Sequence, residues 1–589
     1  MQKSFKIKLL SLTCAAILTV TTACAKEKSN NLNLTKNYTQ SGHVTTNPQS
    51  VGTLTGSYLA GRFAQQNQDW AQAYQYMNRV LKHDQVNNML LQRTFLLSLG
   101  NGQTNEARDL AHKIIKIENE PHELALLFLA SDAMGNRQYD ASLKFLDGLS
   151  GHGLGQYTKP LIGAWNLMAQ NKYDEAMQAL EPSKDFESIY YFHAGLLSEF
   201  SNHNKKANDY YLSAMKFGLS VQETMYIANF FERQNNKKLS NMIYKSIISQ
   251  EPDSPFVNEA KKRLNSDQRP KALLSSANKG ASLGIFSMAS LLYERKAYES
   301  AMVYGQLVQL IEPDMPFVSI MLGDIMAIYG QHEQAILRYN QVSQKSPLHT
   351  LANLRKAEVF EISGNYDAAI QLLKNMAQKD RYDQRDALVY LGDMYRRAER
   401  YQDAVDTYNL VLKGRKDSLK TEDWPVVYAR GMSYERTENW AQAEADLLRA
   451  LELQPNNPLV LNYLGYSWAD RGLHLDKALK MIHRAVTLRP NDGYILDSYG
   501  WALYRTGNFD EAIIWLERSA SNLSNDATIN NHLGDAYWSA GREQEAKFQW
   551  MRALNLAEDP NLLSQIDAKI KNGLEPTSDN NLGAMLISQ

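Results

Sequence analysis

Residues 496–520 read LDSYGWALYRTGNFDEAIIWLERSA, and residues 531–554 repeat the same phrase as NHLGDAYWSAGREQEAKFQWMRAL. The shorter stretch at residues 461–472, LNYLGYSWADRG, matches the first half of the phrase. Self-similarity of this kind is the sequence signature of a repeat architecture. Alignment places three glycines in one column and, twelve or thirteen residues later, three alanines in a second: Gly465, Gly500 and Gly534, then Ala478, Ala512 and Ala546.

The phrase predicts two antiparallel helices joined by a short turn. Small side chains at Gly500 and Ala512 allow the two helices to approach closely. Gly507 lies where the first helix must end, because glycine readily adopts the positive φ of a C-terminal cap. Asp510 and Glu511 then fall in the first turn of the second helix, where carboxylates interact favourably with free N–H groups and the helix dipole.

These columns resemble the tetratricopeptide repeat. The resemblance implies an all-α, right-handed superhelical solenoid of about 14 helical hairpins of this type. Residues 559–572 predict one further helix, which caps the apolar side of the last hairpin. The small residue of the second helix recurs mostly every 34 residues, at fourteen positions: Ala73, Ala107, Ala141, Ala176, Ala207, Ser240, Ala301, Ala335, Ala369, Ala404, Ala443, Ala478, Ala512 and Ala546.

One step of the period is irregular. It spans 61 residues, from Ser240 to Ala301, and prolines punctuate it. This spacer forms either one atypical helical pair or a hinge between two arrays, and the sequence leaves both open. We expect six segments: a lipoprotein signal peptide at 1–23, a flexible tether at 24–53, an N-terminal array at 54–252, an irregular helical spacer at 253–285, a C-terminal array at 286–556, and a capping helix with a loose tail at 557–589.

The N-terminus has three lysines, an apolar run at residues 9–20 and the sequence TTAC at residues 21–24. This layout predicts a secretory signal that is too short for a stable membrane span. The cysteine resembles that of a bacterial lipobox, although Thr21 stands where such motifs usually have leucine. The resemblance implies that Cys24 is lipid-modified and anchors the protein to the outer membrane, facing the periplasm. The alternative is ordinary cleavage that leaves Cys24 as an unpaired thiol.

Charge and motif content exclude several classes of function. The 63 basic and 64 acidic residues nearly cancel, which removes the electrostatic case for nucleic-acid binding. The sequence has no phosphate-binding loop, no HExxH and no pair of CxxC motifs. We therefore expect a protein that is not an enzyme, needs no cofactor or metal ion, and has proteins as partners.

In repeats of this family the first helix of each hairpin lines the surface that binds an extended ligand. Trp501 and Trp538 have an alternative interpretation as packing residues between repeats. Asp497 and Asp535, at inward positions, argue against capture of a terminal carboxylate, so an extended peptide or a folded partner is expected. The family's inward positions predict a protein-binding groove of twelve residues here: Tyr428, Arg436, Asn462, Tyr466, Asp470, Asp497, Trp501, Tyr504, Arg505, Asn531, Asp535 and Trp538.

The overall layout and the phrases LNYLGYSWADRG and DSYGWALYRTGNFDEA are similar to those of bacterial outer-membrane tetratricopeptide lipoproteins. One member type is the adaptor lipoprotein of a periplasmic carboxy-terminal processing protease, which brings peptidoglycan hydrolases to that protease. The resemblance implies a lipid-anchored periplasmic scaffold whose partners are a protease, peptidoglycan enzymes or subunits of an envelope complex. The alternative is an assembly lipoprotein of an outer-membrane secretion, pilus or polysaccharide-export complex.

Overall fold

The computed structural model describes residues 53–117, 122–150, 154–251, 254–379, 384–414 and 419–574. Within these ranges thirty α-helices and two short 3-10 helices follow one another. They form fourteen hairpins, one additional helix after the sixth hairpin and one helix at the C-terminal end, so the predicted all-α solenoid is confirmed. The predicted signal peptide, Cys24 and the tether up to residue 52 lie outside the described residues, as does the tail beyond residue 574.

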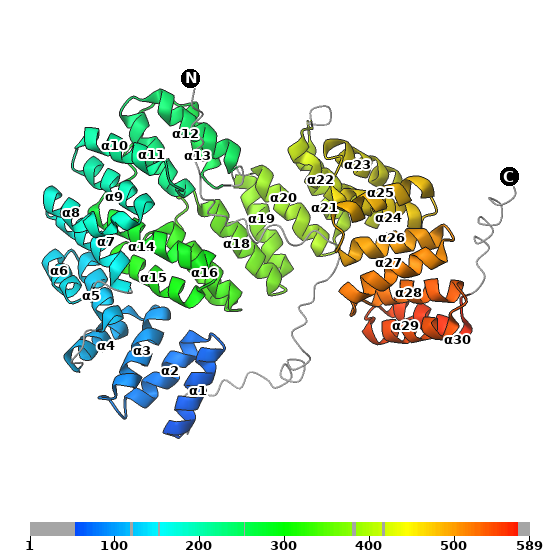
Figure 1. The fold of residues 1–589 in the computed structure, drawn as a ribbon, viewed down its shortest axis with the longest axis horizontal. Helices are drawn as coiled ribbons and strands as arrows, with labels where there is room; N and C mark the ends of the chain where they lie inside the picture. The colour runs from blue at the N-terminus through cyan, green and yellow to red at the C-terminus, as the bar shows by residue number, and fades with distance from the viewer. Residues whose placement is uncertain are drawn as a thin grey trace. The chain divides into compact units, whose positions relative to one another are not determined.

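Contacts divide the chain into unit 1, residues 1–372, and unit 2, residues 373–589, with the boundary inside α19 (Figure 1). The helices up to this boundary are α1 (Leu54–Gln66), α2 (Trp70–Leu81), α3 (Asn88–Gly100), α4 (Thr104–Ile117), α5 (Glu123–Gly135), α6 (Tyr139–Asp147), α7 (Leu154–Ala169), α8 (Tyr173–Leu180), η2 (Glu181–Asp185), α9 (Glu187–Phe200), α10 (Asn204–Ala214), α11 (Val221–Arg233), α12 (Lys237–Gln250), α13 (Val257–Leu264), α14 (Ala277–Glu294), α15 (Tyr298–Ile311), α16 (Pro316–Ile328), α17 (His332–Asn340), α18 (His349–Ile362) and α19 (Tyr366–Lys379). Those of unit 2 are α20 (Gln384–Arg397), α21 (Tyr401–Leu412), η3 (Thr421–Asp423), α22 (Trp424–Arg436), α23 (Trp440–Leu453), α24 (Pro458–Asp470), α25 (Leu475–Leu488), α26 (Gly493–Arg505), α27 (Phe509–Asn522), α28 (Ala527–Ser539), α29 (Glu543–Leu556) and α30 (Pro560–Asn572).

The hairpin of α26 and α27 has the local structure that its sequence predicts. Gly500 and Ala512 are both buried where the two helices meet. Gly507 has a φ of 81°, the left-handed conformation that ends a helix, and the next residue, Asn508, donates its N–H to the Leu503 carbonyl at 3.0 Å. The turn therefore closes α26 and directs the chain back along it as α27.

In unit 1 the hairpin of α14 and α15 packs across helices that lie far away in the sequence (Figure 1). α14 contacts α7 and α9, and α15 contacts α3 and α5. Each of these four partners is the first helix of its own hairpin, and we call the surface that such helices form the first-helix face. The hairpin of α14 and α15, the inserted hairpin, therefore covers the first-helix face of unit 1 from α3 to α9.

Close approach and hydrogen bonds hold the inserted hairpin in place. A Cβ atom on Gly280 of α14 would lie 2.4 Å from the ring of Trp165 of α7, so only glycine permits this contact. On α15, the Gln306 side chain donates to the Gly100 carbonyl at the end of α3, at 3.2 Å, and this contact is buried. Buried, hydrogen-bonded contacts of this kind indicate a permanent part of the fold.

Between α12 and α14 the chain forms the single helix α13, followed by residues 265–276 without a helix. Arg263 of α13 donates to the Glu232 carboxylate of α11 at 3.1 Å, which ties α13 to the preceding hairpin. Residues 277–285, which the sequence assigned to the spacer, form the first half of α14. The predicted spacer thus contains α13 and the first half of α14, and the predicted array boundaries stay predictions.

Unit 2 has no counterpart of the inserted hairpin among its described residues. Each helix from α20 to α29 makes its main contacts with helices one or two positions away. At the C-terminal end α30 packs on α29 and buries Ile566, with Asp559 as its N-cap, so the predicted capping helix is confirmed. From α22 to α26, the described helices of unit 2 leave their own first-helix face open.

Candidate protein-binding surface

The first-helix face of unit 2 is formed by α20, α22, α24, α26 and α28. Because the hairpins repeat with a constant period, residues in the same column of successive first helices lie side by side. All twelve predicted groove residues lie on these helices: Tyr428 and Arg436 on α22, Asn462, Tyr466 and Asp470 on α24, Asp497, Trp501, Tyr504 and Arg505 on α26, and Asn531, Asp535 and Trp538 on α28.

Trp501 is the centre of the contacts between successive first helices. Its half-buried indole stacks on His532 of α28, with ring centroids 4.1 Å apart, and on Tyr504 of its own helix at 4.8 Å. The indole N–H donates to Asp470 of α24 at 3.3 Å, and Arg505 donates to the Asp470 backbone carbonyl at 2.5 Å. These contacts join α24, α26 and α28, so much of the Trp501 surface serves packing between repeats.

Asp497 is buried and paired. Its carboxylate oxygens lie 3.0 and 3.1 Å from Nδ1 of His532, which is also buried. Burial by itself lowers the pKa of His532, but the carboxylates of Asp497 and Asp535 outweigh it, and the net pKa lies above the ordinary value. Asp497 therefore does not present an open negative charge to a ligand.

Asn531 and Asp535 lie beneath the capping helix. Lys569 of α30 donates to the Asp535 carboxylate at 2.7 Å and to the Asn531 side-chain oxygen at 3.0 Å. The indole N–H of Trp550 donates to Asp535 at 2.8 Å from the second helix of the same hairpin. Both predicted groove residues are buried, so the open part of the face ends before them.

The remaining predicted residues differ in exposure. Tyr428 is buried, whereas Asn462 is half-buried and Arg436 is exposed. Trp538 is half-buried, and its ring centroid lies 5.3 Å from that of Trp550 on α29, so the ring packs within its own hairpin.

Three aromatic side chains remain half-buried on the open part of the face: Tyr466, Trp501 and Tyr504. We call them the aromatic ridge. Burial and the nearby carboxylates of Asp470 and Asp497 raise the pKa of Tyr466, and burial raises the pKa of Tyr504, so both phenols keep their protons at neutral pH. The ridge can therefore offer hydroxyl groups as well as ring surface to a ligand.

Sequence reasoning missed His532, because it considered only the repeat positions expected to face the groove. His532 lies at the position next to one of them, Asn531. A search for a partner of Asp497 one repeat period further along the chain leads to Asn531 and its neighbour His532. It also missed Lys569, because the capping helix was recognised from its apolar positions alone.

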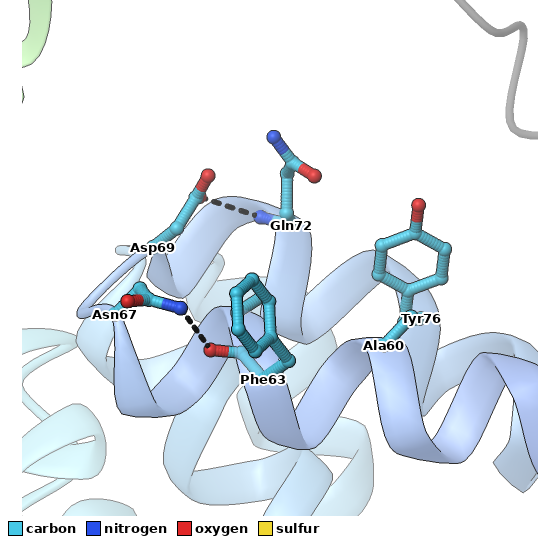
Figure 2. A pocket seen from close by; sticks show the side chains of 7 residues that line it. Ala60, Phe63, Asn67, Asp69, Gln72 and Tyr76 are labelled. Carbon is cyan, nitrogen blue, oxygen red and sulfur yellow. Dashed lines mark hydrogen bonds between the residues drawn. The ribbon is translucent and has the colours of Figure 1, made fainter. Parts of the chain in front are cut away.

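A separate groove of about 400 Å³ lies between α1 and α2 in unit 1 (Figure 2). Figure 2 shows Asn67 donating to the Phe63 carbonyl and the Gln72 N–H donating to Asp69, at 2.9 and 3.0 Å. These two hydrogen bonds lie at the end of α1 and the start of α2, and the polar groups of the groove do not converge on a common point. The lining residues are Ala60, Phe63, Ala64, Asn67, Asp69, Gln72 and Tyr76.

Two general features complete the description of the structure. Among the described residues, no three His, Cys, Asp or Glu side chains gather closely enough to hold a metal ion. Over the same residues, no helix is both long enough and apolar enough to cross a membrane.

Tandem hairpins with an open, aromatic first-helix face define an α-solenoid of the kind that binds other proteins. Family models for the tetratricopeptide repeat match residues 330–384, 363–418, 425–457, 473–527 and 527–560. These residues therefore contain tetratricopeptide repeats, and such repeats form protein–protein interaction scaffolds that are generally not catalytic.

Two curated relatives match segments of the chain. The TPR repeat-containing protein PA4667 of Pseudomonas aeruginosa is 34% identical over 185 residues, which are 31% of this chain and 30% of that protein. The aspartyl/asparaginyl beta-hydroxylase of Mus musculus is 25% identical over 226 residues, 37% of this chain and 26% of that protein. The chain thus spans less than a third of the length of these relatives, and the resemblance to protease-adaptor lipoproteins stays a hypothesis.

Two solved tetratricopeptide or related structures match the chain at low sequence identity. A tetratricopeptide repeat protein from Parabacteroides merdae has a TM-score of 0.36 at 14% identity, covering 44% of this chain and 99% of its own. The APC/C hetero-tetramer Cut9-Hcn1 has a TM-score of 0.38 at 14% identity, covering 89% of this chain and 97% of its own.

Proposed function

We propose that this chain is a lipid-anchored periplasmic adaptor that binds protein partners on the first-helix face of unit 2 and presents cell-wall enzymes to a periplasmic protease. One observation supports the location of the binding surface. The chain's own inserted hairpin covers the first-helix face of unit 1 from α3 to α9, whereas the described helices of unit 2 leave theirs open from α22 to α26.

The chemistry of the open face suits a protein ligand. Tyrosine, tryptophan and arginine are the side chains that most often dominate protein interfaces, and truncating such a residue typically costs about 2 kcal/mol or more of binding free energy. The aromatic ridge supplies the first two, and Arg505 lies at its edge. Stacking and hydrogen bonds already hold Trp501 in place, so a partner that binds here orders few side chains.

The anchor at Cys24 would restrict the adaptor and its partners to the membrane surface. Binding a protease and its substrate to one scaffold raises the concentration of each near the other, which increases selectivity without a new catalytic group. The test is fractionation of cells that express Cys24→Ala. We expect the variant to leave the membrane fraction, and its retention there would refute the anchor.

The binding surface is tested by crosslinking in intact envelopes, affinity purification and mass spectrometry. A double variant, Tyr466→Ala with Tyr504→Ala, removes two members of the aromatic ridge. Its matched control is Phe548→Ala, because Phe548 is 60% exposed on the second helix α29. Circular dichroism confirms that both variants are folded.

We expect the wild type and the control to recover a soluble protease and cell-wall hydrolases, and the double variant to lose them. Equal recovery by all three proteins would place the binding surface elsewhere. Recovery of an integral outer-membrane complex instead would favour the assembly role over the adaptor role.

A further inference from the structure

Two successive second helices of unit 1, α10 and α12, begin with lysines where most others begin with carboxylates. Of the described second helices, ten have Asp or Glu in the first turn. In that turn α10 has Lys205 and Lys206 instead, and α12 has Lys237 and Lys238. The first turn exposes the positive ends of N–H groups, so these four lysines oppose helix formation. Folding therefore does not explain them, and we looked for a ligand that does.

Further cations lie at the same edge of the solenoid, where first helices end and second helices begin. Lys261 and Lys262 lie near the end of α13, and Arg269 follows it in the chain. Lys237 contacts Asp267 at 3.1 Å, so this segment lies beside the start of α12 (Figure 1). Seven exposed cations make up this edge, which we call the basic edge: Lys205, Lys206, Lys237, Lys238, Lys261, Lys262 and Arg269.

Neighbouring carboxylates offset only part of this charge. Asp267 pairs with Lys237, Glu259 lies 3.7 Å from Lys262, and Asp209 is exposed on α10. Ion pairs this exposed are weak and are screened by salt. Two buried carboxylates nearby are already paired with arginines: Glu199 with Arg233, and Glu232 with Arg263. The basic edge therefore stays positive in a chain whose net charge is -1.

We propose that the basic edge binds the headgroups of anionic phospholipids and so orients unit 1 on a membrane surface. Six of its seven cations are lysines. The lysine ammonium is strongly hydrated, and lysine is depleted at protein interfaces, where arginine is enriched. A charged lipid surface attracts clustered lysines without removing their water, so the composition favours lipid over an acidic protein. This contact goes beyond the proposed function, because it needs neither the anchor at Cys24 nor the open face of unit 2.

The test is cosedimentation of the full chain with lipid vesicles. The chain carries Cys24→Ala, so that no acyl chain holds it on the vesicle. We expect binding to vesicles of phosphatidylcholine with about one-third phosphatidylglycerol, and much weaker binding to phosphatidylcholine alone. Raising NaCl from about 0.1 M to about 0.5 M should release the protein, because salt screens exposed charges. Equal binding to both kinds of vesicle would overturn the proposal.

A fourfold variant locates the contact. It changes the four first-turn lysines to glutamine: Lys205→Gln, Lys206→Gln, Lys237→Gln and Lys238→Gln. Binding to anionic vesicles should weaken at least about thirtyfold, since each lysine at such a surface strengthens binding roughly fivefold. The melting temperature should stay equal or rise, because the variant removes charges that oppose the helix dipole, so unfolding cannot account for the loss.

The matched control makes the same change in charge at four exposed lysines of unit 1 outside the basic edge: Lys82→Gln, Lys113→Gln, Lys116→Gln and Lys345→Gln. It should keep vesicle binding within about threefold of the parent. A control that weakens as much as the fourfold variant, or a fourfold variant that binds normally, would overturn the proposal. Binding of soluble polyglutamate but not of anionic vesicles would overturn it too, and would assign the edge to an acidic protein.

Discussion

His193 in unit 1 and His532 in unit 2 occupy the same position of their repeats, two residues before a glycine, and each contacts a tryptophan of the preceding hairpin. In unit 1 the Trp165 indole N–H donates to Nδ1 of His193 at 3.1 Å. In unit 2 Trp501 stacks on His532 instead. A tryptophan and a histidine at equivalent positions thus make two different contacts between hairpins.

The residue at one repeat position explains the difference. That position lies on the first helix of the preceding hairpin, three residues before its small residue. Unit 1 has Leu161 there, and unit 2 has Asp497. Burial without a carboxylate lowers the pKa of His193 to about 3, whereas Asp497 raises that of His532. Leu161 and His193 also lie against Gly284 of the inserted hairpin. The contact between hairpins is therefore apolar on the covered face of unit 1 and charged on the open face of unit 2.

The largest effect on stability is expected from removing Trp165, the tryptophan on the covered face of unit 1. Trp165 is fully buried, so Trp165→Ala should lower the free energy of unfolding of unit 1 by about 3–5 kcal/mol. Trp501→Ala should cost unit 2 less, because Trp501 is half-buried. Hydrogen exchange of peptides from α7 and α26 in denaturant measures each unit separately. Equal losses would mean that the two faces are equally covered.

An intermediate effect is expected from giving unit 2 the residue of unit 1. Asp497→Leu leaves His532 buried without its partner, which should cost about 1–3 kcal/mol and bring the pKa of His532 below its ordinary value. The NMR chemical shifts of the His532 ring protons, followed across a pH titration, report this pKa directly. A pKa that remained raised would show that Asp497 is not the cause, and would point to Asp535.

The smallest effect is the dependence of stability on pH, and the two units should respond in opposite directions. Over this pH range His193 binds its proton only in the unfolded chain. Unit 1 therefore loses stability as pH falls from about 6.5 towards 3, by at most about 1.4 kcal/mol for each pH unit. His532 has a raised pKa when folded, so its stabilisation is fully present below about 6.5 and is lost as pH rises from there through the higher pKa of the folded state.

Urea unfolding at several pH values checks this prediction. His193→Phe should flatten the acid side of the profile for unit 1, and His532→Gln should flatten the alkaline side for unit 2. Parallel profiles for the two units would contradict the assignment of these two histidines.

The repeat columns predicted the hairpins and the cap because each column reports a contact between neighbouring helices, as Gly507 and Ala512 do. They could not predict the inserted hairpin, since Ala301 fits the 34-residue period and α15 reads as an ordinary second helix. For the candidate site, the columns placed all twelve residues on first helices but not their exposure. That depends on single partners outside the period, such as Lys569 above Asp535.

The inserted hairpin also has a consequence that we expect for the order in which the chain folds. Gln306 bonds to Gly100, 206 residues earlier, and Asn278 bonds to the Met134 carbonyl, 144 residues earlier. Contacts over such long loops form slowly, so the first hairpins expose their apolar faces until residue 311 has been synthesised. Unit 2, whose contacts are local, folds hairpin by hairpin. We therefore expect the N-terminal half, although it is made first, to finish folding after its inserted hairpin has been made.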